Sequence, residues 1–526
     1  MKDIKRFQQM HRDGRIDRRE FLAAMGALGV SATAAGGLLT SSKALAATPK
    51  KGGLARAASN LHGPDDQMDP IVFTSGIDYT RGRATYNNLI QMLDGMALHP
   101  ELAEEWSPNA NATEFTFKIR KGVEFHDGSP LTADDVVWSM SRHLGEDSPS
   151  TAKSFFTAVT EWKKVDGHTV KAVLSSPDSD LPAKLSEKQA KIVKMGTEDF
   201  RKGNGTGPYL LESFEPGVRS THVRNPNYWR DGPNFDALEV TAITDPIARV
   251  NALIAGDMDL IYTVDAKGVR LIEQSEGVHI NSTPSGLYGG ICCLKNTEPG
   301  SNDDFVMGLR YIQDRERIVR SILKGHGTVG NDHPIGPAYG ADHCSELPQR
   351  EFDPDKAKFH LDKSGYTSAE LYVAPVIAGI EEVCLLMQAN LKKIGFDLQI
   401  KKVPTDGYWG AVWMKEPLNV VSWNMRPTAN AMLGIQFEPG GNWNDTFWNN
   451  ERFGELLKLQ LAETDSDKRH AMLCEMQELV HTGSGMVIPA HVNILDGVSD
   501  KIQGIPNVPV GAMGAYEWVE FAWMEA

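Results

Sequence analysis

The chain has 526 residues, with 69 acidic and 54 basic side chains and a net charge of −15. This length predicts two or three globular domains, and the composition is that of an ordinary folded protein. So acidic a surface repels nucleic acid and anionic lipid, which excludes both as general partners.

Residues 1–46 have the features of an export signal. A basic region contains Arg18 and Arg19, a weakly apolar stretch follows over 21–39, and small residues close the segment at 44–46. This order is typical of a cleaved signal peptide, and the arginine pair resembles the twin-arginine export signal. We expect cleavage near Ala46-Ala47 and a mature protein in the periplasm. An uncleaved membrane anchor is the alternative, but the stretch is rich in Ala and Gly and poorly hydrophobic.

A strand, a turn and a helix are predicted in succession over residues 115–140. Phe115, Phe117 and Ile119 alternate with polar residues, which is the pattern of a half-buried strand. A His-Asp-Gly-Ser-Pro turn follows it. Thr132 then suits the N-cap of a helix, with Asp135 at the matching position of a capping box.

Two helix–strand units follow later in the chain. The first is a helix that ends at Gly256 and leads into a strand over 260–264. The second is a helix over 381–394, with apolar residues at three- and four-residue spacing, ended by Gly395. A strand with alternating apolar residues follows over 396–400. Strands and helices alternate throughout, which predicts an α/β protein.

The cysteines give little chemistry. There are five, an odd number that cannot all pair within one chain, and none has the spacing of metal ligands. Cys292 and Cys293 lie in an apolar run, which indicates buried thiols. An oxidising periplasm permits a disulfide, whose partners the sequence leaves open. We predict no metal site and no cofactor.

Three motif-like stretches do not support enzyme chemistry. Residues 325–330 spell Gly-x-Gly-x-x-Gly but follow a helical run, so they predict a helix end and turn rather than a dinucleotide site. Residues 203–208 lack the Lys-Ser/Thr of a phosphate-binding loop. His126 and Asp127 lie in the predicted turn, which favours a structural role. We predict no catalytic residue, although a secreted hydrolase of peptides or esters stays open as an alternative.

One arginine stands in the otherwise uncharged stretch Val-Val-Ser-Trp-Asn-Met-Arg-Pro-Thr-Ala-Asn, residues 420–430. Its first four residues predict a buried strand that runs into a Pro turn. An unpaired buried charge is costly, so Arg426 must face a ligand, water or an acidic partner. A guanidinium binds carboxylate, sulfonate or phosphate groups, often through two parallel hydrogen bonds. The residues alone leave open whether Arg426 binds a ligand, pairs with an internal Asp or Glu, or is simply exposed.

Five sequence blocks occur in the order found in one protein family. They are "LAEEWSPNANATEFTFKIRKGVEFHDGSPLTADDVVWSM" (102–140), "GTGPYLLESFEPGVRSTHVRNPNYW" (205–229), "VNALIAGDMDLI" (250–261), "LRYIQDRERIV" (309–319) and the helix–strand unit 381–403. Together they resemble the large extracytoplasmic solute-binding proteins of ABC importers, a group that includes dipeptide-, oligopeptide- and nickel-binding proteins. The resemblance runs across nearly the whole mature chain.

The resemblance implies a two-lobed α/β fold, the type II periplasmic binding protein fold in its large three-subdomain form, with a hinge and an interlobe cleft. Lobe I would contain residues 47–82, 205–290 and 495–526, with a subdomain over 83–204, and lobe II residues 291–494. Such proteins close on a ligand and then dock on a membrane permease. The expected partners are a small-molecule ligand and the permease subunits of an ABC transporter, with the protein itself a monomer.

The resemblance also gives Arg426 a context. Peptide-binding members have a Trp-x-Gly-Asp stretch at this point, whose Asp binds the α-ammonium group of the ligand. Here the stretch is Trp423-Asn424-Met425-Arg426, so the charge is inverted. This favours a solute with a carboxylate or other anionic group over a peptide with a free N-terminus, although a modified peptide stays possible. Nickel or metallophore binding, which occurs in the family, is a weaker alternative that no His spacing supports.

Aromatic and amide side chains are the other predicted ligand contacts. Aromatic walls with a few polar anchors are typical of small-molecule pockets, although core packing is the alternative for each Trp. With Arg426, the predicted contacts are Trp423, Asn424, Tyr408, Trp409, Trp443, Asn444, Asn60 and Tyr288.

Overall fold

The computed structural model describes residues 49–59 and 66–525 of the chain. The predicted export signal and Asn60 lie outside these residues. Among the described residues, no helix combines the length and the apolar character that crossing a bilayer requires.

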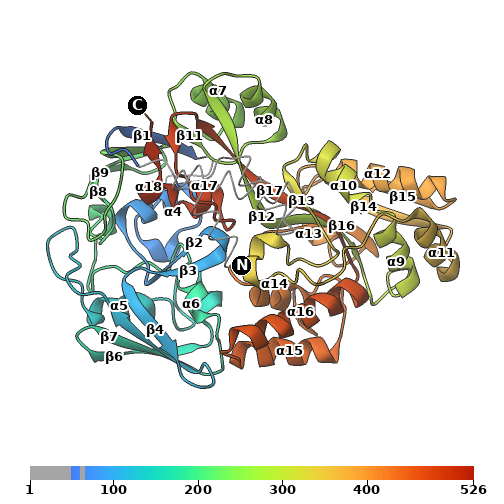
Figure 1. The fold of residues 1–526 in the computed structure, drawn as a ribbon, viewed down its shortest axis with the longest axis horizontal. Helices are drawn as coiled ribbons and strands as arrows, with labels where there is room; N and C mark the ends of the chain where they lie inside the picture. The colour runs from blue at the N-terminus through green and yellow to red at the C-terminus, as the bar shows by residue number, and fades with distance from the viewer. Residues whose placement is uncertain (1–48, 60–65, 526) are drawn as a thin grey trace, which may run out of the picture.

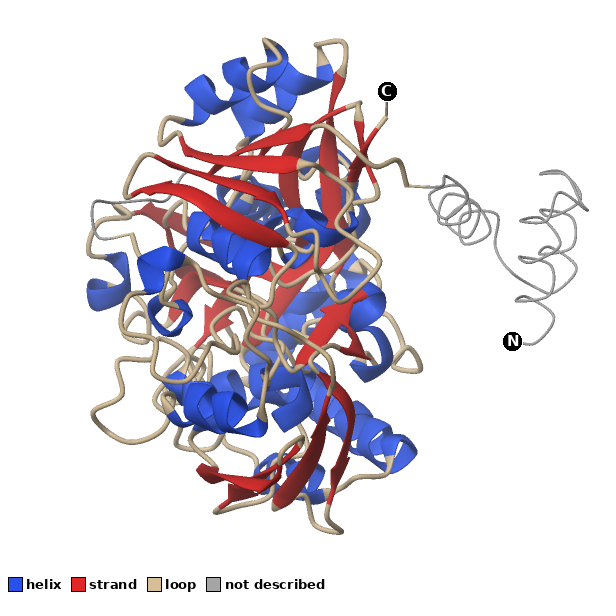
Figure 2. Cartoon of the chain, turned by 90° about the vertical axis from the view of Figure 1, so that its left-hand side faces the viewer, coloured by secondary structure: helices blue, strands red, loops and turns tan. Residues whose placement is uncertain are grey.

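A single mixed sheet runs through the molecule (Figure 1). Its outer strands lie in two separate groups, and two long strands in the middle join them. Figure 2, seen from the left-hand side of Figure 1, shows the strands in red with blue helices beside them. In spatial order the sheet contains β15 (Asp397–Lys402), β14 (Ser368–Val373), β16 (Leu418–Trp423), β12 (Val278–Cys293), β17 (Met486–Ser499), β11 (Leu260–Ile261), β1 (Leu54–Ser59), β10 (Ala237–Ala242), β9 (Arg219–Arg224) and β8 (Tyr209–Glu215), with β13 (Gly327–Val329) paired to β17.

Three bodies with separate apolar cores surround this sheet. We call lobe I the body around β1, β11 and α4 (Gly76–Thr85), and lobe II the body around β14, β16 and α12 (Ile380–Lys393). The small-sheet unit is the third, with α5 (Ala133–Ser141) packed on a sheet of four strands. These strands are β4 (Ala103–Pro108), β5 (Glu114–Ile119), β7 (Thr169–Leu174) and β6 (Val159–Asp166). The exact domain boundaries stay a prediction.

The strands β12 and β17 join the two lobes and contain an irregularity at their centre. Thr283 pairs with Ile494 and Leu287 pairs with Val492, so three residues of β12 lie opposite one residue of β17. Extra residues of this kind interrupt the ladder of hydrogen bonds and bend a strand. The pairing of the two strands that connect the lobes is therefore irregular here, and it shifts again between Gly289 and Ile291.

The local predictions for residues 115–140 are confirmed. Phe115, Phe117 and Ile119 of β5 are all buried. At the start of α5, Thr132 donates its N–H and its hydroxyl to the carboxylate of Asp135, at 2.8 and 2.7 Å, in the predicted capping box. Short-range patterns suffice here because each element is fixed by its own turn and capping residues.

The helix–strand units are confirmed with one correction. Gly395 follows α12 with φ 86°, as expected of a helix C-terminus, and β15 follows it. After α7 (Pro246–Ile254), however, the strand predicted over 260–264 ends at Ile261. Thr263 has φ 56° and donates its N–H to the carboxylate of Asp496 at 3.0 Å, so this backbone leaves the ladder. In the Gly-rich stretch 325–330, Gly325 has φ 86° after the helical run, as a helix end would, but Gly327–Val329 form the short strand β13 instead of a turn.

Candidate ligand-binding site

Arg426 lies just past the carboxyl end of β16. The strand is buried, as predicted, and the chain leaves it through exposed Asn424. The Arg426 side chain is half-buried, and its Nη1 donates to the carbonyl of Asn424 at 3.3 Å. Its backbone N–H donates to the hydroxyl of Tyr339 at 3.2 Å. Among the described residues no carboxylate forms an ion pair with Arg426, so this guanidinium has no internal counter-charge.

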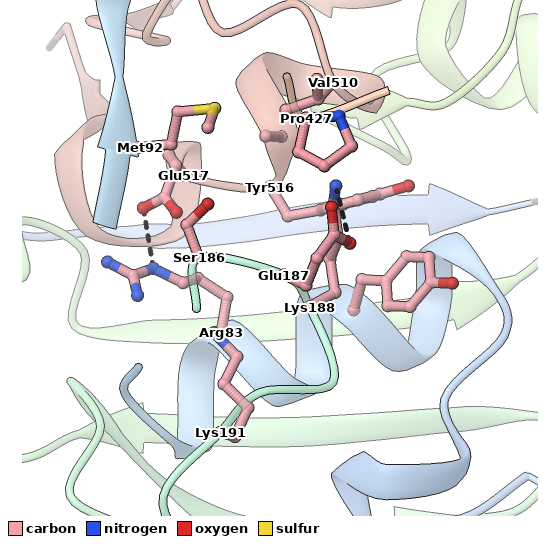
Figure 3. A pocket seen from close by; sticks show the side chains of 12 residues that line it. Arg83, Met92, Ser186, Glu187, Lys188, Lys191, Pro427, Val510, Tyr516 and Glu517 are labelled. Atoms are coloured by element: carbon pink, nitrogen blue, oxygen red, sulfur yellow. Dashed lines mark ion pairs between the residues drawn. The ribbon is translucent and has the colours of Figure 1, made fainter. Parts of the chain in front are cut away.

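The residues after Arg426 contact parts of the protein that are distant in sequence. Pro427 lines a small cavity with Tyr79, Tyr516 and Glu517, which belong to lobe I (Figure 3). The cavity has a volume of about 20 Å³, room for roughly one water molecule. The stretch that carries Arg426 is therefore placed where the two lobes meet.

The lobe I side of this cavity contains a buried network of charged groups. The guanidinium of Arg83 forms ion pairs with three carboxylates. The nitrogen–oxygen distances are 2.6 Å to Glu101, 2.8 Å to Glu517 and 2.7 Å to Glu520. Burial raises the pKa of Glu517 to about 7, against the attraction of Arg83. Burial and the nearby Arg83 lower the pKa of Lys191 to about 8. Two groups beside the cavity thus have pKa values close to neutral, which is common at functional sites.

Backbone strain occurs in the segment that supplies Tyr516. Met513, Ala515 and Tyr516 all have positive φ, at 50°, 57° and 70°, a region that side chains other than Gly rarely adopt. The carboxylate of Asp496 supports this turn by accepting the N–H of Met513 at 2.6 Å. Strain of this kind concentrates at functional sites, where the surrounding structure holds it in place.

Five aromatic rings form a continuous series beside the end of β16. Neighbouring ring centres are 5.4 to 5.9 Å apart, and each contact is edge-to-face. Trp409 and Trp443 remain 44% and 52% exposed, which is unusual for such large apolar side chains. The series runs Tyr408, Trp409, Trp413, Trp443, Trp423. It presents the indoles of Trp409 and Trp443 to solvent, supported by the buried rings of Tyr408 and Trp423 and the partly buried ring of Trp413.

Behind these rings lies a buried carboxyl group, Asp445. It accepts a hydrogen bond from Nε1 of Trp423 at 2.9 Å. Its other oxygen faces Gln436, whose side-chain oxygen accepts the hydroxyl of Tyr288 at 2.6 Å. Burial raises the pKa of Asp445 to about 6. This network fixes the orientation of Trp423, and with it the edge on which Trp443 packs.

Several predicted contact residues use their polar atoms inside the protein. The Tyr408 hydroxyl donates to the carbonyl of Val420 at 2.8 Å, and the Asn444 amide donates to the carbonyl of Trp448 at 2.7 Å. The Tyr288 hydroxyl donates to the side-chain oxygen of Gln436. The more accessible of the predicted residues that the structure describes are Asn424, Arg426, Trp409 and Trp443. All of these assignments stay predictions.

The sequence did not point to the lobe I residues of the site. Tyr79, Arg83, Lys191, Tyr516 and Glu517 come from distant parts of the chain and carry no common motif. The burial of Arg83, which calls for acidic partners, becomes visible only in the fold.

Two of the cysteines lie together in space, which their spacing in the sequence did not reveal. Cys344 and Cys474 form a disulfide, and Cys292 and Cys293 are buried free thiols, as predicted. The only group in the described chain with three potential metal-ligand atoms close together is Cys344, Glu346 and Cys474, and both its sulfurs belong to the disulfide. This group therefore suits a disulfide rather than a metal.

The family of the chain follows from comparison with known proteins. The profile of the bacterial extracellular solute-binding proteins, family 5 (middle part) matches residues 97–444, more than half of the chain. The chain belongs to this family. The solute-binding proteins of ABC importers that the five sequence blocks resemble are thus confirmed as its relatives, and members of the family are binding proteins.

Two curated relatives and one solved structure illustrate the similarity. Heme-binding protein A of Haemophilus influenzae is 24% identical over 84% of this chain and 88% of its own length. The dipeptide-binding protein of Escherichia coli is 24% identical over 85% of this chain and 91% of its own. The structure of HbpA2 from Haemophilus parasuis superposes with a TM-score of 0.79 and 21% identity, covering 90% of this chain and all of that one. The two-lobed periplasmic binding protein fold is thereby confirmed.

Proposed function

We propose that this solute-binding protein captures a small solute bearing a carboxylate or other anionic group between its two lobes. The observation that supports this most is Arg426, a half-buried guanidinium at the meeting of the lobes that forms no ion pair with any carboxylate among residues 49–59 and 66–525. A guanidinium in such a place is most stable when an anion joins it. The exposed indoles of Trp409 and Trp443 add apolar surface for the body of the solute.

The proposal includes delivery and location. The closed, loaded protein docks on the permease of an ABC importer and releases the solute unchanged, acting as a monomer without catalysis. Export through the twin-arginine signal brings it to the periplasm. Replacing the pair by Arg18→Lys and Arg19→Lys should leave the precursor in the cytoplasm, as cell fractionation would show; unchanged export would assign the signal to another pathway.

The direct test is the affinity of Arg426 variants. The solute that co-purifies with the wild-type protein is released by denaturation, identified by mass spectrometry and added back to ligand-free protein. Arg426→Ala should weaken its binding about 10- to 100-fold, because a hydrogen bond to a charged group is lost from a desolvated site. Arg426→Lys should recover part of the affinity, since it keeps the charge but loses the planar fork.

Arg270→Ala is the matched control, because Arg270 is an exposed arginine on α8 (Ala266–Glu273), away from β16 in Figure 1. Equal affinity of wild type, Arg426→Ala and Arg270→Ala would disprove a ligand role for Arg426. Recovery of a mixture of ordinary dipeptides would contradict the proposed solute class.

A further inference from the structure

A single buried carboxylate joins the small-sheet unit to lobe II. Asp180, just before α6 (Leu181–Lys184), is 3% exposed. One of its oxygens accepts a hydrogen bond from Arg469 at 2.6 Å, and the other accepts the hydroxyl of Thr428 at 2.6 Å. Arg469 lies in the first turn of α16 (Ser466–Gly483), and Thr428 is the N-cap of α14 (Ala429–Phe437). Both donors belong to lobe II.

Neighbouring contacts strengthen the same junction. The N–H of Ser179 donates to the carbonyl of Leu461 at 2.9 Å, and its hydroxyl donates to the carbonyl of Gln460 at 3.2 Å. Arg469 also donates to the Ser179 hydroxyl. Figure 1 shows α6 beside α15 (Glu451–Ala462) and α16, at the end of the small-sheet unit that faces lobe II.

These contacts do not form a continuous core. A cavity of about 480 Å³ lies beside them, with Trp106, Phe115 and Pro182 on the side of the small-sheet unit. Arg469 and His470 line it from lobe II. A junction made of a few polar contacts next to unfilled space can separate without exposing a large apolar surface. The two bodies are thus able to part here, at the cost of the bonds to Asp180 and Ser179.

Thr428 links this junction to the proposed ligand site. It follows Arg426 by two residues, and its hydroxyl both donates to Asp180 and accepts the N–H of Ala431 at 3.1 Å. The first of these bonds connects two bodies, whereas the second caps α14. Contact between the small-sheet unit and lobe II therefore fixes the turn that carries Arg426.

We propose that Asp180 is a positioning residue, through which the small-sheet unit fastens lobe II in the closed form and holds the Arg426 turn in place for the solute. Its link to the solute rests on the proposed function, whereas its role in closure does not. When the lobes separate, Asp180 and Arg469 return to water. When they close, each supplies the other's counter-charge.

The test uses Asp180→Asn in the full-length mature protein. Asn keeps the size of the side chain and can accept from Thr428, but it removes the negative charge opposite Arg469. Spin labels at Lys121→Cys and Lys458→Cys, both exposed, report the distance between the small-sheet unit and lobe II. The native free cysteines of the described chain are buried, so they should not be labelled.

In ligand-free refolded protein, Asp180→Asn should shift the label distances toward a longer, broader distribution. The affinity for the co-purifying solute should also fall about 10- to 100-fold, because the substitution removes a charge-assisted bond that only the closed form makes. Less solute should therefore remain bound after purification. Thermal unfolding checks that the variant is folded. Unchanged distances in a folded variant would overturn the proposal.

Asp178→Asn is the matched control. Asp178 is also buried, but in the described structure its side-chain bonds stay inside the small-sheet unit: one oxygen pairs with Lys184 at 2.5 Å, and the other accepts the N–H of Asp180 at 3.2 Å. It should leave the distances unchanged; an effect equal to that of Asp180→Asn would mean that the segment acts only by its local stability, which overturns the proposal. Arg426→Ala should leave the ligand-free distances unaltered. If the co-purified solute proves to have no anionic group while Asp180→Asn still lengthens the distances, the proposed function fails and the role of Asp180 in closure stands.

Discussion

Asp445 gives the stability of the protein a specific dependence on pH. Burial raises the pKa of its carboxyl from 3.8 to about 6 in the folded protein. A raised pKa means that the folded state binds a proton that the unfolded state releases. The contribution of Asp445 to the free energy of unfolding is therefore fully present below about pH 4, and it is lost as the pH rises through about 6.

Asp445→Asn should remove this dependence. The amide can still accept the indole N–H of Trp423, and it needs no proton to be neutral. Relative to wild type, the variant should gain about 2 kcal/mol in free energy of unfolding between pH 4 and pH 7. Urea titrations at several pH values measure the difference. If the free energy of unfolding varied with pH in the same way for both proteins, ionisation of Asp445 would not destabilise the folded state.

Asp496 offers an independent comparison. Burial also raises its pKa to about 6, but it lies in β17 and supports the strained turn of lobe I. The effects of Asp445→Asn and Asp496→Asn on the free energy of unfolding should add in a double variant, because the two residues share no bonding partner in the described structure.

At the scale of single residues, the sequence indicated one side of the site better than the other. Arg426 stood out as the one charged residue in the stretch 420–430, and Trp443 as an aromatic residue next to Asn442 and Asn444. The importance of Glu517 or Asp180 depends on the residues that the fold brings beside them, and no local pattern encodes that. Buried polar groups joined by contacts between distant segments are invisible to short-range rules.

The irregular centre of β12 depends on a residue without a side chain. A Cβ atom on Gly286 would lie 2.7 Å from the ring of Tyr339 and 3.0 Å from Cγ of Met425. Both neighbours belong to the surroundings of Arg426, because Tyr339 accepts its N–H and Met425 precedes it. Close packing against Gly286 thus connects the joining strand to the candidate site.

Gly286→Ala should therefore affect both stability and binding. The added methyl group must displace Tyr339 or Met425, which should lower the free energy of unfolding by about 1–3 kcal/mol and weaken solute binding. Chemical denaturation and titration with the co-purified solute measure the two effects. Gly167→Ala is the control, since no atom lies within 4 Å of a Cβ built there. Equal behaviour of the two variants would show that this packing can relax freely.

At the scale of elements, capping and turn residues predicted the ends of helices and strands better than apolar patterns did. The capping box at Thr132 and the helix end at Gly395 appear where expected because each signal acts within four residues. The strand predicted to reach residue 264 stops early, before Thr263, which has a positive φ and donates its N–H to the carboxylate of Asp496, a residue distant in sequence. Apolar residues alone could not show that turn.

For the whole molecule, the order of the sequence blocks predicted the architecture, and the family match confirms it. The order of strands in the sheet could not have been read from the chain. β17, near the C-terminus, lies between β12 and β11, so the sheet is completed by paired residues that are 194 to 238 positions apart. Such pairings reflect the burial of both faces of a long strand, which periodicity does not locate.

The disulfide between Cys344 and Cys474 spans 130 residues of sequence, and both the Arg426 turn and the exposed Trp443 lie between these two cysteines. A protease that cut the chain once inside this loop would leave two fragments still joined by a covalent bond. The part of lobe II that carries Arg426 could not then diffuse away from the remainder. In a compartment that contains proteases, a nicked molecule would keep its complete set of solute contacts for as long as the bond between these sulfurs stays oxidised.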